Sequence, residues 1–449
     1  MTQNGTILIE GTDDGGDLRR RLEETLDSEV LLVCMVQHRE IVESVAKSFD
    51  QPPKVVSLAS VDDHVARVLQ DVNTERVAFL PERASFVKPA WDELPASVPS
   101  LMPWLPEAQL PDVQAIEEPS DARAWLASKV FLHRLTRPLK ISEWSFFNLA
   151  IAAQEAEQSV RWPSPRASSS RVVDLVTDHP ALNRNSSVCA LIPHYRCEQW
   201  LGACLESLLA QTRPLDGIVV IDDASPHPPV EIVRRFPTVT LLTAAENGGP
   251  YRLIQEVINN TRYDAYLFQD ADDWSTSDRL ELLLDEAERT GAELIGSQEL
   301  RVLCDSSEIL PCRYPLDVNA ALAVRPAHPL LHPTSMIARD LVQRLGGFAT
   351  GLRFGGDSEL LLRAGYVARI VNVPSYCYFR RHRSGSLTTD PTTGLETPVR
   401  LELQKLLKER QMNNASAVLR GESPLLEPFA SAAPAQLTHI LGPELSRRL

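Results

Sequence analysis

Two stretches of the 449-residue chain alternate short apolar runs with segments of helical periodicity. In the first stretch, apolar runs at 30–36, 55–60 and 76–80 are separated by helical patterns at 41–49 and 65–72. Such a βαβαβ order is typical of a parallel sheet with crossover helices. We therefore predict an N-terminal α/β domain over residues 1–120.

The second alternation is longer and clearer. Apolar runs at 188–192, 217–222, 239–243 and 265–268 predict four strands with helical segments between them. The first of these helices is well supported, because four leucines share one face with Cys204 beside them; they are Leu201, Leu205, Leu208 and Leu209. This pattern predicts an α/β domain with a mostly parallel, Rossmann-like sheet over residues 186–395.

The remaining segments are predicted to connect and extend these two domains. Prolines between 95 and 119 disfavour long helices, and helical sequence resumes around 121–157. With a surface linker at 161–170, this makes residues 121–185 a helical connector. Residues 396–449 are predicted to be a C-terminal helical extension. Its run 401–411 carries mixed charges, which favours a helix docked on the body over one on a membrane surface.

Composition narrows the class of protein. A hydrophobic fraction of 43% and a charged fraction of 23% are those of a globular chain. The formal net charge of -15 repels nucleic acid and anionic lipid, so neither is an expected partner. No apolar run approaches the roughly 18–20 residues of a membrane span, and the first residues do not resemble a secretory signal. Seven scattered cysteines without a C-x-x-C pair indicate reduced thiols and a cytoplasmic protein.

Three carboxylates crowd the turn that follows the 265–268 strand: Asp270, Asp272 and Asp273. Ligands of an open α/β sheet sit at the carboxyl ends of its strands, where this turn falls. Carboxylates this close repel one another unless a cation lies between them, and hard oxygen ligands suit Mg²⁺ or Mn²⁺. The alternative is a solvated acidic turn in which Asp273 caps a helix beginning near Ser275.

Other strand ends carry candidate ligand contacts. Tyr195 ends the first strand and would either stack on a nucleobase or pack at the sheet edge. Asp222-Asp223 end the second strand, where a carboxylate would bind a base N–H or ribose hydroxyl, or form an Asx turn. Gly249 closes the turn 247–249 after the third strand, where glycine permits a close approach of the backbone to phosphate. Each of these signals is weak by itself.

In order, the segments I-P-x-Y, V-x-D-D-x-S, N-x-G and D-A-D-D resemble those of the family 2 glycosyltransferases with the GT-A fold. Downstream, Gly346-Gly347-Phe348 is similar to the family's G-G-F turn, and Gly356-Asp357 to its acidic motif. The segment from Tyr378 through Arg380 and His382 to Ser386 resembles its closing Y-x-R-x-H-x-x-S motif. The resemblance covers residues 187–389 and implies a GT-A domain that takes a nucleotide-diphosphate sugar.

The resemblance also implies a role for each matched position. Asp223 would read the base, most often uracil, with Tyr195 lying against it. Asp270 would contact the ribose or a metal-bound water. Pro193, Gly249 and Arg252 complete the set that we expect to bind the donor nucleotide.

Metal and base roles follow in the same way. Asp272 would ligate Mn²⁺ or Mg²⁺ beside the diphosphate, with Asp273 as a second candidate. His382 would complete the metal or diphosphate site from the other side, and the less favoured alternative is a surface histidine in a basic turn. Asp357 would be the general base that takes the acceptor's proton. We expect its pKa to be raised, because it should lie in a partly dry cleft near other acids.

Some positions depart from the family pattern. Ile254-Gln255 stand where many relatives have Arg-Asn, Arg196 stands where asparagine is usual, and Gly356 rather than an acid precedes Asp357. There is no Q-x-x-R-W motif, which argues against a processive polysaccharide synthase.

The sequence therefore predicts an inverting glycosyltransferase. Its donor would be a nucleotide-diphosphate sugar, most often of UDP, its acceptor a saccharide, natural product or peptide, and homo-oligomers are possible. One alternative is a sugar nucleotidyltransferase, whose G-x-G-x-R-L loop is missing here. A D-x-D phosphatase would need Asp at the end of the first strand. The third alternative is a non-catalytic sugar-binding or scaffolding relative.

The N-terminal domain echoes the second one. After the 76–80 strand, Pro81-Glu82-Arg83 stand where the acidic triplet would be. This suggests a degenerate GT-A-like half that has lost its metal carboxylates and serves acceptor binding, dimerisation or core support. An unrelated small α/β domain is the alternative.

Overall fold

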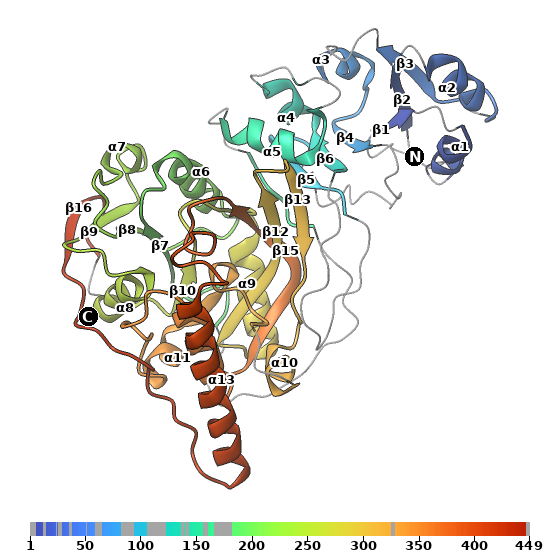
Figure 1. The fold of residues 1–449 in the computed structure, drawn as a ribbon. Coiled ribbons are helices and arrows are strands. Elements are labelled where there is room, and N and C mark those ends of the chain that lie inside the picture. The colour runs from blue at the N-terminus through green and yellow to red at the C-terminus, as the bar shows by residue number, and fades with distance from the viewer. Residues whose placement is uncertain are drawn as a thin grey trace. The chain divides into compact units, whose positions relative to one another are not determined.

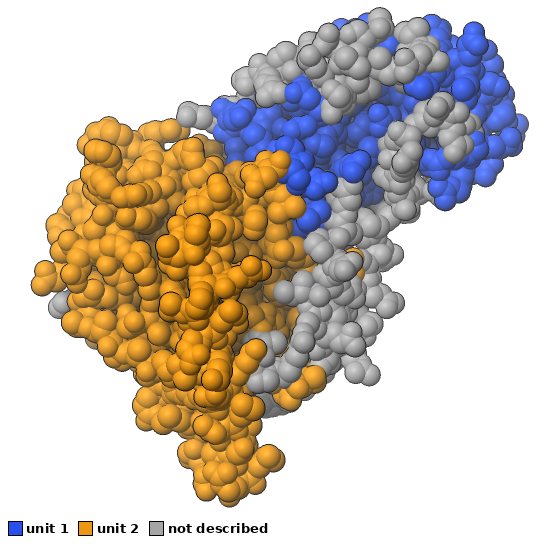
Figure 2. Space-filling model, viewed as in Figure 1, with its two compact units in different colours: residues 1–108, 120–165, 306–311 blue, residues 109–119, 166–305, 312–449 orange. Residues whose placement is uncertain are grey.

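The structure, a computed structural model, forms two compact units (Figure 2). Unit 1 comprises residues 1–108, 120–165 and 306–311, and unit 2 comprises 109–119, 166–305 and 312–449. The residues that the structure describes are 6–11, 15–23, 25, 29–35, 38–50, 52–58, 65–81, 94–105, 123–135, 139, 143–155, 160–165, 182–324 and 328–445.

Helices and strands alternate through the first 155 residues (Figure 1). They are β1 (Thr6–Gly11), α1 (Gly15–Glu23), β2 (Glu29–Met35), α2 (Arg39–Ala46), β3 (Lys54–Leu58), α3 (Val65–Val68), η2 (Leu69–Asp71), β4 (Arg76–Leu80), β5 (Leu101–Pro103), β6 (Trp125–Ser128), α4 (Lys129–Arg134) and α5 (Phe146–Glu155). The sheet order is β3-β2-β1-β4-β6-β5, with β1 to β4 parallel and β6 antiparallel to β4.

The three strands predicted in this region, β2, β3 and β4, are confirmed, and three strands, β1, β5 and β6, were missed. β1 lies at the centre of the sheet, and Ile7, Leu8 and Ile9 have no solvent exposure. β6 falls within the stretch 121–157 that was expected to be helical. That expectation was wrong because all four residues of β6 are buried against β4 and β5, so tertiary pairing overrides local helical preference.

From residue 188 onward the elements form a second, larger set. They are β7 (Val188–His194), α6 (Glu198–Leu209), β8 (Gly217–Asp222), α7 (Val230–Val233), β9 (Thr240–Ala244), α8 (Pro250–Asn260), β10 (Ala265–Phe268), β11 (Trp274–Ser275), α9 (Arg279–Thr290), β12 (Leu294–Leu303), β13 (Glu308–Cys312), α10 (Val318–Val324), η5 (His332–Thr334), β14 (Met336–Ala338), α11 (Arg339–Arg344), α12 (Gly356–Ala364), β15 (Ile370–His382), α13 (Pro398–Leu419) and β16 (Leu437–Leu441).

The sheet of unit 2 runs in the order β11-β15-β12-β14-β10-β7-β8-β9-β16. β7 to β10 are parallel to their neighbours in this run, whereas β14 and β16 are antiparallel to β10 and β9. This mixed α/β sheet with a parallel centre confirms the predicted fold class. The carboxyl ends of β7, β8 and β10 therefore lie at one edge of the sheet, which is where ligands bind in open α/β folds.

Three local expectations in unit 2 need correction. Leu209 is 43% exposed, although the other three leucines of α6 are buried. α9 begins at Arg279, so Asp273 does not cap a helix near Ser275. The tail beyond the predicted C-terminal helix adds β16, an edge strand on β9. Among the described helices, none has both the length and the apolar composition to cross a membrane.

Both units begin with the same sheet topology. Unit 1 orders its first strands β3-β2-β1-β4 and adds the antiparallel β6, and unit 2 orders them β9-β8-β7-β10 and adds the antiparallel β14. In unit 1, the buried Arg21 of α1 donates to the backbone carbonyls of Glu10, Leu80 and Pro81, at the carboxyl ends of β1 and β4. Glu82 and Arg83, which the sequence aligned with the acidic triplet, lie outside the described residues.

Candidate functional site

The ends of β7 and β8 are locked together by a buried histidine–aspartate pair. His194 Nδ1 lies 2.8 Å from Asp222 Oδ1, and neither side chain is exposed. The other oxygen of Asp222 accepts the Ser225 amide at 3.0 Å. Burial raises the pKa of the Asp222 carboxyl, but hydrogen bonds from His194 and Ser225 outweigh it and hold this pKa below its ordinary value. Asp222 therefore fixes the strand ends and leaves Asp223 to face the site.

Asp223 organises the glycine turn. Its two carboxylate oxygens accept the amides of Gly248 at 2.7 Å and Gly249 at 2.9 Å, and Gly249 has φ 82°. Burial raises the pKa of Asp223 despite these donors. The structure thus brings Asp223 and Gly249 together as predicted. A carboxylate offers about four acceptor positions, so two remain for a base N–H or a ribose hydroxyl.

Tyr195 is open to solvent beside this carboxylate. Its side chain is 40% exposed, and the Arg196 guanidinium lies 5.0 Å from its ring centroid. Pro193 lies in β7 opposite Ile221 of β8, so it contributes backbone to the same edge. An exposed aromatic ring at a strand end is available to stack on a planar ligand.

The backbone conformation at residue 196 favours asparagine, which is the usual residue at this position of the family pattern. The φ of Arg196 is 54°, in the left-handed region, where Asn is tolerated far better than Arg. Its amide donates to Ser225 Oγ at 3.2 Å, which holds the turn in this conformation.

We predict that Arg196→Asn stabilises the protein by about 0.5–1 kcal/mol, because it relieves backbone strain. Urea unfolding measures the effect. Arg234→Asn is the matched control, since Arg234 is also exposed but has φ -56°, and this variant should not stabilise. Equal effects of the two substitutions would show that strain at Arg196 is not the cause.

Arg252 and Gln255, both on α8, make their contacts outside the expected donor site. Arg252, which was expected at the donor, pairs with Glu246 at 2.9 Å and donates to the carbonyls of Ala433 and Pro434. Its guanidinium therefore holds the C-terminal segment. Gln255 accepts the Phe348 amide at 2.8 Å, so this departure from the family pattern fixes the G-G-F turn.

The acidic turn lies between β10 and β15. The Asp270 amide donates to Tyr378 Oη at 3.0 Å, and Asp273 Oδ1 accepts the Arg381 amide at 2.6 Å. Asp273 is 3% exposed, so its carboxylate anchors β15 to the turn. Desolvation first, and repulsion from Asp272 second, raise the pKa of Asp270 to about 7, although the residue still presents surface to solvent.

Asp272 forms an ion pair with an arginine that the sequence did not single out. Arg383 Nε lies 2.7 Å from Asp272 Oδ2, with the two side chains 18% and 15% exposed. The same guanidinium donates to Cys197 Sγ at 3.3 Å and lies 4.4 Å from the Trp200 ring centroid. Arg383 thus joins the acidic turn to the segment that follows Tyr195.

The carboxylates of the acidic turn suit a divalent cation that takes most of its ligands from water and from the substrate's phosphate oxygens. Within the described residues, no group of three or more His, Cys, Asp or Glu side chains is arranged to hold a metal. Mg²⁺ commonly binds proteins through only one or two carboxylates and completes its shell with water and phosphate oxygens. Asp270 and Asp272 fit that description, because their mutual repulsion is relieved by added positive charge.

His382 ends β15 as an exposed side chain. Alternation along the strand puts it on the same face as Tyr378 and Arg380. Tyr378 contacts the Asp270 amide, and the charge of Arg380 lowers the pKa of Asp270. His382 therefore shares its face of β15 with two side chains that act on Asp270, whereas Arg381, on the opposite face, donates to the Asp272 carbonyl.

Asp357 lies in the first turn of α12 and is surrounded by hydrogen-bond donors. Its Oδ1 accepts the Tyr251 hydroxyl at 2.9 Å, and its Oδ2 lies 3.7 Å from His328 Nε2. Burial raises the pKa of Asp357, but His328, His332, the Ser358 amide and Tyr251 together hold it below its ordinary value. The expectation of a raised pKa was wrong, because these donors and imidazoles outweigh desolvation.

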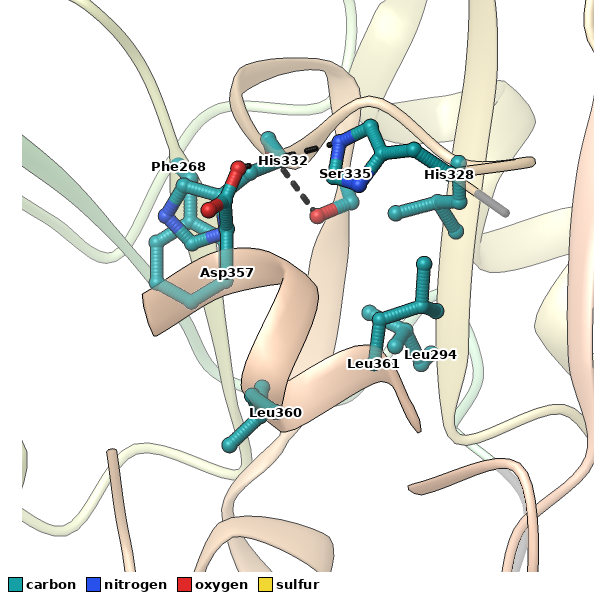
Figure 3. Close-up of a pocket in the computed structure, with 9 residues that line it drawn as sticks. Phe268, Leu294, His328, His332, Ser335, Asp357, Leu360 and Leu361 are labelled. Atoms are coloured by element: carbon teal, nitrogen blue, oxygen red, sulfur yellow. Dashed lines mark hydrogen bonds and ion pairs between the residues drawn. The ribbon is translucent and has the colours of Figure 1, made fainter. Parts of the chain in front are cut away.

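A small pocket opens beside Asp357 (Figure 3). His328 and His332 lie on either side of the carboxylate in this view, and leucines from α12 and β12 form the lower wall. The His332 ring stacks on Phe268 at the end of β10, with centroids 4.1 Å apart. Burial lowers the pKa of His332 to about 4, so this imidazole is neutral at pH 7.

Asp357 and the acidic turn belong to one electrostatic site. Burial first, and then the charges of Asp357 and Asp270, raise the pKa of Tyr251, and the charge of Asp357 adds to the desolvation that raises the pKa of Asp270. Phe268, two residues before Asp270, stacks on His332 of the Asp357 pocket. The end of β10 and the start of α12 therefore lie at one pocket, although they are about ninety positions apart in the chain.

Sequence reasoning missed four contributors to the site: Tyr251, His328, His332 and Arg383. Tyr251, His328 and His332 stand outside the matched motifs, so no spacing marked them. Arg383 directly follows the Y-x-R-x-H segment, and a basic residue beside that motif was the one available signal.

Comparison with known proteins finds a family match over the part of this site that comes from β7 to β10 and the acidic turn. Residues 189–314 match the family Glycosyl transferase family 2. The chain is 30% identical over 102 residues to glycosyltransferase GlyA of Streptococcus pneumoniae, covering 22% of this chain and 15% of that protein. It is 27% identical over 221 residues to the uncharacterized glycosyltransferase EpsJ of Bacillus subtilis, covering 45% of this chain and 63% of that protein. The chain thus spans less than two thirds of either relative.

Solved structures include a similar chain at low identity. The crystal structure of S. aureus TarS in complex with UDP-GlcNAc has a TM-score of 0.37 and 19% sequence identity, and the match covers 44% of this chain and 60% of that one.

Proposed function

Because residues 189–314 match glycosyl transferase family 2, we propose that this chain transfers a sugar from a nucleotide-diphosphate donor to an acceptor nucleophile with inversion. Uridine diphosphate is the donor nucleotide that the sequence resemblance implies. The observation that carries the proposal is the packing of Phe268, which ends β10 two residues before Asp270, on His332 in the pocket that Asp357 lines. Donor binding and proton removal need acidic groups on two sides of one reacting centre.

Donor binding is assigned to the edge formed by β7, β8 and the glycine turn. Tyr195 offers an exposed ring for the base, and Asp223 offers free acceptor positions beside it. Asp270 and Asp272 would hold Mn²⁺ or Mg²⁺, which supplies positive charge to the departing diphosphate. Asp273 and His382 are secondary candidates, with Asp273 already engaged by the Arg381 amide.

Asp357 is assigned the role of general base. It is ionised at neutral pH because its pKa is low, and Tyr251 orients the carboxylate through Oδ1. Oδ2 then takes the proton of the acceptor hydroxyl while that oxygen attacks the anomeric carbon from the face opposite the diphosphate. A positioned base of this kind contributes about 10²–10⁴-fold in rate.

Unit 1 is assigned a non-catalytic role as a degenerate copy of the transferase core. Its first strands repeat the order of unit 2, and Arg21 fills the space between the carboxyl ends of β1 and β4 with three hydrogen bonds to carbonyls. Such a plug suits support or acceptor binding better than nucleotide binding, because the strand ends of an open sheet are where a ligand would enter.

The acceptor is proposed to be a saccharide, a natural product or a peptide side chain, and the reaction is placed in the cytoplasm. Cys189, Cys197, Cys204 and Cys304 are free thiols, which supports a reducing compartment.

Thermal unfolding with a panel of nucleotides tests donor binding. UDP with Mn²⁺, at about 100 times its dissociation constant, should stabilise the wild type by about 2.7 kcal/mol. Asp272→Asn should lose most of this stabilisation, and Asp357→Asn should keep it. If no nucleoside diphosphate stabilises the wild type with Mn²⁺ or Mg²⁺, the proposed donor site is wrong.

A further inference from the structure

The Asp272–Arg383 ion pair places a cation of the chain itself on the carboxylate that the proposed function assigns to a divalent metal. The pair is mostly buried, with a 2.7 Å contact between Arg383 Nε and Asp272 Oδ2. A guanidinium keeps its proton in proteins, so Arg383 is charged. One carboxylate oxygen of Asp272 is therefore already neutralised before any ligand binds.

The rest of the guanidinium is held weakly. It contacts Cys197 Sγ at 3.3 Å and the Ser384 carbonyl at 3.4 Å, and it lies over the Trp200 ring. A thiol is a poor acceptor, and a face of an aromatic ring supports an arginine without fixing its direction. Among these contacts of the guanidinium, Asp272 is thus the one strong acceptor.

Hydrogen bonds hold the backbone at Arg383, whereas its long side chain has several rotamers open to it. The Arg383 carbonyl accepts a hydrogen bond from Thr389 Oγ1 at 2.7 Å, and the Ser386 amide donates to the same Thr389 hydroxyl. Arg383 directly follows β15, which Asp273 ties to the acidic turn through the Arg381 amide. A change of rotamer therefore redirects the guanidinium without moving the strand.

We propose that Arg383 is the resident counter-ion of Asp272 and transfers to the donor's diphosphate when the donor binds together with its divalent cation. The inference rests on the proposed donor site. A planar guanidinium binds phosphate oxygens in a bidentate manner. A cation bound to the neighbouring carboxylate does not prevent this. Arg383 would then make cation binding depend on the nucleotide, because without the nucleotide the cation must displace an ion pair.

Two binding constants with opposite expected changes test the proposal. Binding of Mn²⁺ alone is measured from the electron paramagnetic resonance signal of free Mn²⁺, and binding of UDP by calorimetry at saturating Mn²⁺. Arg383→Gln should bind Mn²⁺ alone about tenfold more tightly than wild type, because Asp272 loses its competitor. It should bind UDP about tenfold more weakly, because the diphosphate loses a partner. A loss of structure would weaken both.

Arg196→Gln is the matched charge control, since it removes one positive charge near Tyr195 without touching the Asp272 ion pair. Its Mn²⁺ constant should stay within about twofold of wild type. Arg383→Lys keeps the charge but loses the planar fork, so it should bind Mn²⁺ like wild type and UDP several-fold more weakly. This variant decides the question if Arg383→Gln does not fold.

The outcomes separate the two proposals. Unchanged or weaker Mn²⁺ binding by Arg383→Gln, or an unchanged UDP constant in both Arg383 variants, overturns the role of Arg383 while the wild-type UDP site stands. If the wild type binds UDP neither alone nor with Mn²⁺, the proposed function fails and the inference fails with it.

Discussion

Asp357→Asn is expected to lower the turnover number for UDP formation by about 10²–10⁴-fold while leaving UDP binding unchanged. The amide keeps the shape of the carboxylate and a contact with Tyr251, but it cannot accept the acceptor's proton. The measurement is UDP release from a UDP-sugar with Mn²⁺, with water or an added saccharide as the acceptor. Donor binding is followed in parallel by calorimetry.

Asp340→Asn is a matched control, because Asp340 is also in the first turn of a short helix of unit 2. It should retain wild-type turnover. A wild-type rate for Asp357→Asn would remove Asp357 from the mechanism, and a loss of UDP binding would make it a donor ligand instead.

The pH profile of the turnover number gives the same assignment a second test. The pKa of Asp357 lies below the ordinary value of 3.8, so the base form prevails above that pH and is lost only as pH falls through it. With donor and metal saturating, we expect no acid limb attributable to Asp357 above about pH 4. An acid limb near neutrality that disappears in Asp357→Asn would contradict the low pKa.

Arg363→Met is expected to destabilise unit 2 by about 3–5 kcal/mol. Arg363 is 2% exposed, and its guanidinium forms an ion pair with Glu359 at 2.6 Å. It also donates to the carbonyls of Leu345, Gly347 and Leu426. Removing it leaves a buried carboxylate with Arg410 as its one remaining arginine, and strips donors from two buried carbonyls and a part-buried one. Urea unfolding monitored by fluorescence measures the loss.

A double substitution separates the unpaired charge from the lost packing. Glu359→Leu combined with Arg363→Met should recover part of the stability, since no buried charge remains. Arg420→Met, which breaks the exposed pair with Glu422, should leave the free energy of unfolding almost unchanged. If Arg363→Met is as mild as Arg420→Met, Arg363 does not hold α12 in place.

Much of the fold was visible in the sequence because its strands are continuous apolar runs. The runs at β7, β8, β9 and β10 are almost fully buried, so their hydrophobicity marks them without help from the rest of the chain. β6 and β16 were missed because each is defined by its pairing with a strand far away in sequence. Local pattern does not encode such partners.

The site was predictable to the extent that ordered motifs carried it. The family match over residues 189–314 confirms the resemblance that those motifs predicted. No motif indicated which side chains would pair with one another. The low pKa of Asp357 depends on Tyr251 and two histidines from other segments, and the Arg383 pair depends on the approach of β15 to the acidic turn. These contacts arise from tertiary packing, so residue types and spacing do not reveal them.

The account rests on a single nucleotide site at the carboxyl edge of the sheet in unit 2. A crystal structure of the wild type with UDP and Mn²⁺, using the anomalous signal of manganese, tests this most directly. We expect the base beside Tyr195 and Asp223, the diphosphate at the turn 270–273, and a manganese peak adjacent to Asp272. Nucleotide bound elsewhere on the chain, or manganese remote from Asp272, would contradict it.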